Sequence, residues 1–200
     1  MVIVWESRME DVDGEALPFY RCTKEGTVMM EYNEVWCLFC TTGKESSVAE
    51  RIHEKGWGRA IFPQRVKTIR RNREWTEQSV PLLPGYVFMY MQQRKTNRVE
   101  LEKLLGVIRV LDYSEPGEST LLGRDREFAD WLWHFDGKIG TMQALQVGDR
   151  IEIIDGAFRA LNGTILRMDR RRQTFLVSLD TEGVIRKVWL TYEVVEKRKK

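Results

Sequence analysis

The segment Pro81-Leu82-Leu83-Pro84-Gly85-Tyr86-Val87-Phe88-Met89-Tyr90 joins a proline-rich corner to an apolar run, and the other elements are expected to surround it. Its prolines lack amide donors, so the corner cannot lie inside a helix or a central strand. Gly85 allows a turn, and Tyr86 to Tyr90 has the aromatic and branched side chains of a buried strand. A strand alternates its faces, so the apolar side chains of the corner cannot all enter one core. Either part of this surface faces a partner, or the corner covers a local hydrophobic cluster.

The composition describes a globular chain with room for two modest domains. It has 200 residues, of which 42% are hydrophobic and 31% charged, values that exclude both a disordered chain and a membrane protein. No apolar run approaches the roughly 18 residues of a membrane span, and Glu6 interrupts the apolar start Met1 to Trp5. We therefore expect a cytoplasmic protein with no membrane partner.

The cysteines and histidines do not predict a metal site. Cys22, Cys37 and Cys40 are too few for a disulfide framework. Cys37 and Cys40 have C-x-x-C spacing, but positions three apart on a strand face opposite sides. His53 and His134 are isolated in the sequence. There is also no glycine-rich phosphate loop and no nucleophile elbow, so we expect no metal, no cofactor and no enzymatic activity.

Residues 1–34 are acidic and show no helical or strand period. We expect this extension to be disordered or to result from a mis-annotated start. Lys24-Glu25-Gly26 can be encoded by a ribosome-binding sequence, and natural translation would then begin at Met29 or Met30.

Residues 35–135 alternate between strand and helix patterns. Val35 to Thr41 predicts a central strand, and Thr42 with Glu45 fits a capping box at the start of a helix. Arg59 to Trp75 suggests an extended arm or hairpin with basic residues at its tip. The remaining elements of this part are a short helix capped by Thr96 with Leu101, Leu104 and Leu105 facing inward, a strand over Val107 to Leu111, and a helix over Arg124 to Phe135. This order predicts an α+β domain in which helices cover a mainly antiparallel sheet.

The helical spacing ends at residues 136–145, which we interpret as a linker. Residues 146–197 then give short strands at close intervals, with turns at Asp155-Gly156, Asn162-Gly163 and Glu182-Gly183. About fifty residues of this kind suit a small β-barrel.

Three groups of residues occur in an order that resembles the NusG family of transcription elongation factors. They are Trp36 on the first strand, Leu83-Pro84-Gly85-Tyr86-Val87, and Val147 to Phe158 followed by Leu161-x-Gly163-Thr164-Ile165. The resemblance implies a NusG N-terminal (NGN) domain over 35–135 and an SH3-like KOW barrel over 146–197. It implies binding rather than catalysis.

The resemblance also implies where partners bind the NGN domain. Such domains dock on the clamp helices of the largest RNA polymerase subunit through an apolar depression, which here would contain Trp36, Leu83, Pro84 and Tyr86. A tryptophan that simply fills the core is the alternative for Trp36. The basic side of the domain approaches upstream or non-template DNA, and the corresponding cations are Lys44, Arg70, Arg71 and Arg73.

The KOW loop departs from the common family pattern. It contains Phe158 and Leu161, but Ala157 replaces the usual proline, which argues against Rho or a ribosomal protein as partner. The barrel is basic instead, through Arg159, Arg167, Arg170, Arg171, Arg172 and Lys187. Such a barrel is similar to that of LoaP-type paralogues and predicts binding to a nascent RNA hairpin. A solvated basic turn is the alternative.

We therefore expect a monomeric factor that binds polymerase and promotes processive antitermination at selected operons. Two other interpretations are a general NusG factor that couples polymerase to Rho or the ribosome, and a ribosome-associated KOW protein that binds RNA.

Overall fold

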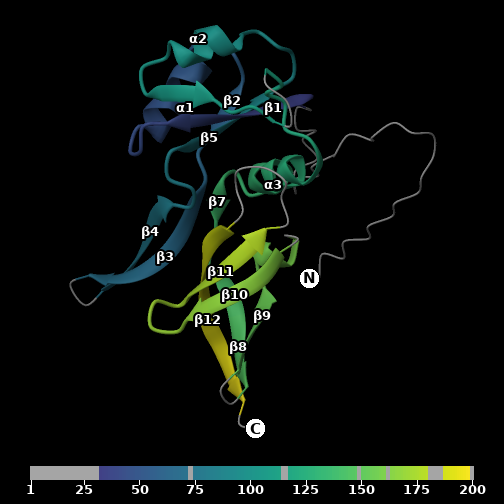
Figure 1. Ribbon diagram of the computed structural model, residues 1–200. Helices are drawn as coiled ribbons and strands as arrows, with labels where there is room; N and C mark the ends of the chain where they lie inside the picture. The colour runs from purple at the N-terminus through teal and green to yellow at the C-terminus, as the bar shows by residue number, and fades with distance from the viewer. Residues whose placement is uncertain are drawn as a thin grey trace, which may run out of the picture. The chain divides into compact units, whose positions relative to one another are not determined.

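The computed structural model describes residues 32–71, 74–113, 117–147, 150–160, 163–179 and 187–198 (Figure 1). Most of the predicted acidic extension, including Met29 and Met30, lies outside these residues. Its last residues belong to the fold, because the hydroxyl of Tyr32 donates to Asp130 Oδ1 across 2.8 Å and its ring contacts Tyr90 at 4.9 Å. The folded part therefore includes residues before 35.

The N-terminal sheet is built around the apolar run that follows the proline corner. This run forms β5 (Tyr86–Met91), which pairs antiparallel with β1 (Glu34–Cys40). The edge strands are β2 (Arg59–Ile61) and β6 (Val107–Val110), and the order is β2-β5-β1-β6. The two central strands are almost entirely buried because helices cover both of their faces.

The two faces of this sheet carry separate hydrophobic clusters. One face packs on α1 (Glu45–Glu54) and α2 (Arg98–Glu102), and the other packs on α3 (Gly123–His134) (Figure 1). Strand alternation divides β1 accordingly: Cys37 lies in the cluster on the α3 side, whereas Cys40 lies in the cluster on the α1 side. The prediction that the two cysteines face opposite sides is confirmed.

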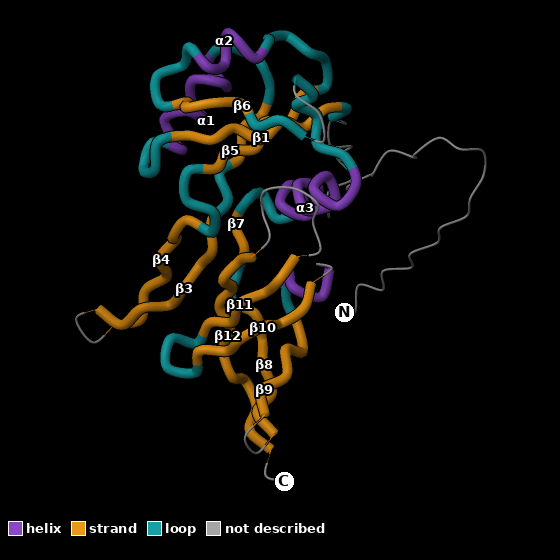
Figure 2. The backbone as a smooth tube through the Cα atoms, in the orientation of Figure 1, coloured by secondary structure: helices purple, strands orange, loops and turns teal. Residues whose placement is uncertain are grey.

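A long hairpin leaves the N-terminal sheet before the proline corner. It consists of β3 (Gln64–Arg71) and β4 (Glu74–Pro81), and β7 (Lys138–Ile139) adds a parallel third strand beside β3 (Figure 2). The predicted basic arm is thus a hairpin, and its tip at residues 72 and 73 lies outside the described residues. The predicted linker contains β7 and the first residues of β8; its boundaries remain a prediction.

The C-terminal sheet is a curled half-barrel. Its elements are β8 (Met142–Val147), β9 (Arg150–Asp155), the 3₁₀ turn η1 (Ala157–Ala160), β10 (Gly163–Asp169), β11 (Thr174–Leu179) and β12 (Lys187–Arg198). The order is β10-β11-β12-β8-β9, in which β12 and β8 are parallel and the other pairs antiparallel. This sheet, together with the helix-covered N-terminal sheet, confirms the predicted α+β class.

Side-chain packing and hydrogen bonds join the α3 side of the first sheet to the half-barrel. A single hydrophobic cluster extends from Phe88 through Trp131 of α3 to Phe175 of β11. Trp131 Nε1–H donates to the carbonyl of Ala157 across 2.8 Å, and Arg65 Nη1 donates to Thr191 Oγ1 across 3.4 Å. The chain beyond α3 therefore packs against the N-terminal elements rather than leaving them.

Three local predictions were wrong. Thr42 does not cap α1: the N-cap residue is Lys44, without a side-chain hydrogen bond. Asn97, rather than Thr96, caps α2, because its side chain accepts from the amide of Glu100 at 3.0 Å. Leu105 is 76% exposed instead of facing inward, because α2 ends at Glu102 and helical spacing no longer positions it.

Candidate protein and nucleic-acid interfaces

The proline corner is held by the first residue of α1. Glu45 is buried, and its Oε1 accepts a hydrogen bond from the amide of Gly85 across 2.7 Å while its Oε2 accepts from the amide of Gly43 across 2.7 Å. Gly85 has φ +84, and an added Cβ would lie 3.0 Å from the carbonyl oxygen of Cys40. Only glycine fits this turn without strain. The carboxylate thus fixes the conformation in which the corner presents its apolar tip.

The exposed part of the corner continues into a row of side chains on the sheet. Pro84 is exposed and Tyr86 is half-buried. Phe39 is the cross-strand partner of Tyr86, with ring centroids 5.4 Å apart, and Arg109 of β6 is the next partner along the same row. Burial raises the pKa of Tyr86, with Arg109 acting in the opposite direction, so the phenol stays neutral at physiological pH. The row presents two aromatic rings beside a cation.

Trp36 does not join this surface, which corrects the predicted depression. It is 4% exposed and lies in the cluster on the α1 side, opposite Met89 in the strand register. Its indole Nε1–H donates to Thr120 Oγ1 across 3.3 Å, and the guanidinium of Arg94 lies 5.1 Å from its ring. Trp36 and Tyr86 are on opposite faces of one sheet, so they cannot contact the same partner surface together. Leu83 is also buried.

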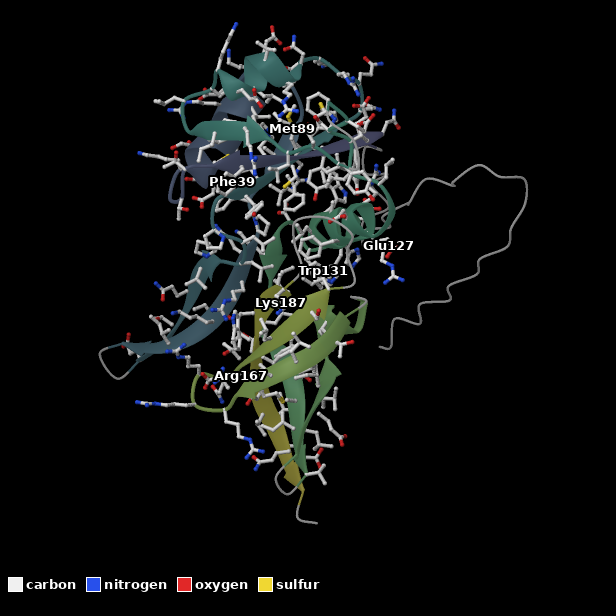
Figure 3. The ribbon with its side chains drawn as sticks, viewed as in Figure 1. Phe39, Met89, Glu127, Trp131, Arg167 and Lys187 are labelled. Atoms are coloured by element: carbon white, nitrogen blue, oxygen red, sulfur yellow. The ribbon has the colours of Figure 1, made fainter. Side chains whose placement is uncertain are left out.

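Sequence reasoning missed Phe39. The signal was present, because a strand places residues 36 and 39 on opposite faces, and the same rule had already separated Cys37 from Cys40. Figure 3 labels Phe39 and Met89, which belong to the two different faces. The surface that the structure brings together consists of Phe39, Pro84, Tyr86 and Arg109; we call it the corner patch.

The predicted DNA-side cations come from two different elements. Lys44 is exposed at the N-terminal end of α1, beside the exposed Thr41 and Thr42. Arg70 and Arg71 belong to the far end of β3, which Figure 1 shows away from α1; their side chains and Arg73 are outside the described residues. The structure therefore does not bring Lys44 together with the hairpin.

The predicted KOW loop is partly buried. Phe158 packs edge-on against Phe175 of the half-barrel, with ring centroids 5.3 Å apart, and its amide donates to Met142 Sδ at 3.4 Å. The preceding carbonyl of Ala157 is the acceptor for Trp131. Leu161 and the side chain of Arg159 lie outside the described residues. Phe158 is thus a packing residue in this structure.

The described cations of the half-barrel are exposed. Arg170, Arg171 and Arg172 form the turn between β10 and β11, where Asp169 Oδ1 accepts from the amide of Arg172 at 3.0 Å. Arg167 and Lys187 lie on β10 and β12 (Figure 3). Both groups belong to the neighbouring strands β10, β11 and β12 or to the turn that joins the first two, so these cations gather on one part of the half-barrel.

Comparison with known proteins identifies the first part of the chain. Residues 35–128 match the family model described as "NusG: Transcription termination factor nusG". These residues form a NusG-family domain. The match covers the sheet, both of its faces and the first half of α3, so the corner patch belongs to the NusG domain. Because the family is one of non-enzymatic transcription factors, the prediction that the chain is not an enzyme is confirmed.

Among solved structures, the chain is similar to NusG from Thermotoga maritima. The TM-score is 0.46 at 23% identity, and the similarity covers 79% of this chain and 93% of that one. A search of curated proteins found no significant match.

Two further observations concern the described residues. Their side chains contain no cluster of three or more histidines, cysteines or carboxylates that could hold a metal ion. None of the helices in the described ranges is both long and apolar enough to cross a bilayer.

Proposed function

We propose that the chain is a transcription elongation factor of LoaP type, which binds the clamp helices of RNA polymerase and promotes antitermination at selected operons. The NusG domain would hold polymerase, and the basic half-barrel would bind a structured leader RNA. The observation that carries the proposal is the occurrence, in one short chain, of a NusG-family domain with an apolar corner patch and of a half-barrel with clustered arginines.

The chemistry of the corner patch supports polymerase binding. Aromatic side chains and arginine are the residue types that supply most of the binding energy at protein interfaces. Phe39 and Tyr86 retain part of their surface in solvent, and the Glu45–Gly85 hydrogen bond fixes the turn before binding. A pre-ordered anchor loses little conformational entropy when a partner covers it. Coiled-coil helices carry apolar side chains flanked by charged ones. Such a surface would complement the aromatic rings and Arg109.

The charge of the half-barrel supports RNA binding. Each phosphate contact made by an arginine releases counterions, so affinity is expected to fall steeply with salt. The alternative partners of the general NusG factors, Rho and the ribosome, would need the loop that contains Phe158. That loop is engaged with Phe175 and with Trp131 in this structure, and it lacks the usual proline. We therefore favour RNA as the partner of the half-barrel.

The test is transcription by purified polymerase through an intrinsic terminator, with and without the natural leader upstream. The expected result is read-through that requires both the protein and the leader RNA. A Tyr86→Ala protein should lose read-through on every template, while a Val99→Ala protein, changed at an exposed residue of α2, should retain it.

Two outcomes would overturn the proposal. Equal read-through with and without the leader would assign a general elongation role. Normal read-through by a folded Tyr86→Ala protein would remove the corner patch as the polymerase-binding surface.

A further inference from the structure

One tryptophan of the half-barrel points away from its core. Trp189 lies on β12 between Val188 and Leu190, which are both buried, whereas Trp189 is 36% exposed. In the strand register Trp189 is the partner of Leu176, and Leu176 is the partner of Arg167. These three side chains form a row across the outer face of β10, β11 and β12.

The rows on either side are polar. Along the chain direction of β12, the row before Trp189 consists of Thr164, Ser178 and Lys187. The row after it consists of Asp169, Thr174 and Thr191. Thr191 accepts the hydrogen bond from Arg65, so β3 covers this end of the face and supplies another cation. The indole thus lies in a polar surface with Lys187 on one side and Arg65 on the other.

A bulge enlarges the apolar surface of the central row. The register of β10 shifts between Ile165 and Arg167, which leaves Leu166 as an extra residue that is 51% exposed. A bulge beside a binding site commonly re-aims side chains. Here it places an exposed leucine and the cation Arg167 at the end of the row that contains Trp189.

Two carboxylates of the described part of this face lie beyond the two ends of the row that contains Trp189: Asp169 at the β10–β11 turn and the exposed Glu193, four residues after Trp189 on β12. Asp169 already accepts the amide of Arg172, and it lies at the β10–β11 turn, away from Lys187. Thr174 and Thr191 are buried, so the accessible polar groups around the indole are the hydroxyls of Thr164 and Ser178 and the cations Arg167 and Lys187. Hydroxyl groups and cations around a flat indole suit phosphates and a base rather than an apolar protein helix. Exposed aromatic rings on a sheet are the platform on which proteins stack unpaired bases.

We infer that Trp189 stacks on an unpaired base of RNA, with Arg167 and Lys187 binding the neighbouring phosphates. The inference rests on the proposed RNA-binding function and goes beyond it, because it predicts that the half-barrel requires a single-stranded nucleotide in its target. A base in the loop of a hairpin is accessible for stacking, whereas a base inside a duplex is not.

The test uses the full chain and two fluorescent probes, an RNA hairpin with a pyrimidine loop and a blunt duplex with the same stem. Stacking of one base contributes about 1–3 kcal/mol, so Trp189→Ala should weaken hairpin binding about 5- to 150-fold and leave duplex binding unchanged. Trp189→Phe keeps an aromatic ring and should retain hairpin affinity within about threefold. Val195→Ala, at an exposed residue of the same strand, is the matched control.

A second measurement does not depend on the alanine variant folding. Hairpin binding should quench part of the tryptophan fluorescence of the natural chain, and this part should be absent in Trp189→Phe. If hairpin binding is salt-dependent but Trp189→Ala binds as the natural chain does, stacking is refuted and the proposed function stands. Equal weakening of hairpin and duplex binding also refutes stacking. If the natural chain binds neither probe, both the inference and the RNA part of the proposed function fail.

Discussion

The carboxylate of Glu45 accepts the amide hydrogen of Gly85 across 2.7 Å, although the two residues are forty positions apart. The other carboxylate oxygen accepts from Gly43, so one buried side chain fixes both the loop before α1 and the turn before β5. The sequence pattern predicts that Glu45 belongs to a local capping box. Its actual role is to connect the helix to the corner patch.

Replacing Glu45 should therefore destabilise the fold and disorder the corner. In Glu45→Gln the side-chain nitrogen cannot accept, which leaves one amide donor without its partner at a cost of about 1–3 kcal/mol. Urea unfolding monitored by circular dichroism measures this change. Glu50→Gln, on the exposed side of α1, is the control and should change stability by less than about 0.5 kcal/mol. Equal stability of both variants would contradict the role assigned to Glu45.

The two faces of the N-terminal sheet predict different phenotypes for two aromatic residues of β1. Phe39→Ala should weaken polymerase binding about tenfold or more, because it removes half of the aromatic pair in the corner patch. Trp36→Phe should lower the free energy of unfolding by about 1 kcal/mol because the hydrogen bond to Thr120 is removed, with little effect on polymerase binding. Affinity for purified polymerase and urea unfolding would separate the two. The assignment of faces is wrong if the folded Trp36→Phe protein is the one that no longer binds polymerase.

The arginine turn predicts a change in the salt dependence of RNA binding. The logarithm of RNA affinity falls with the logarithm of salt concentration. Replacing Arg170, Arg171 and Arg172 by glutamine should make this fall shallower, by about one unit of slope for each phosphate that an arginine no longer neutralises. The turn itself should persist, since Asp169 accepts a backbone amide there. The control replaces Lys55, Lys95 and Lys103, three exposed lysines of the NusG domain, with the same change in net charge. Identical slopes for the two triple variants would indicate non-specific attraction only.

The buried thiols predict a loss of stability at alkaline pH. Burial is the main cause that raises the pKa of Cys40 from its ordinary 9.0 to about 12, and burial also raises the pKa of Cys37. The unfolded chain would ionise these thiols first, so their contribution to stability is intact below pH 9 and falls as the pH rises through about 12. In a Cys22→Ser background, neither thiol should react with a disulfide reagent at about pH 8 until urea unfolds the chain. Rapid reaction of the folded protein would contradict their burial.

The sequence predicted the elements better than their faces and ends. The elements with strong patterns, β1, β5 and α3, formed where expected. A strand buried on both faces needs a continuous apolar run, and a helix that covers a sheet needs apolar residues at helical spacing. The prediction that Trp36 and Tyr86 share one surface was wrong. The family motif specifies the order of the residues along the chain, whereas the alternation of each strand decides which face of the sheet a side chain is on. Applied to every residue of β1, the same alternation predicts that Phe39, rather than Trp36, lies on the face of Tyr86.

Long-range hydrogen bonds account for most of what the sequence did not predict. The cap of α1 was misassigned because Glu45 bonds to the amide of Gly85 before β5 instead of serving only its own helix. The bulge at Leu166 and the row that contains Trp189 depend on the register between β10, β11 and β12, and no local pattern specifies a register. The basic residues of the half-barrel were recognised from sequence, whereas the tryptophan among them was not.

The central position of β12 has a consequence for synthesis of the chain. Strands β8 and β9 form one hairpin and β10 and β11 another, and β12 lies between the two hairpins in the sheet. The half-barrel cannot assemble until residues 187–198 have left the ribosome, whereas the NusG domain is complete much earlier. A nascent chain would therefore be able to fold its polymerase-binding part before its second domain exists.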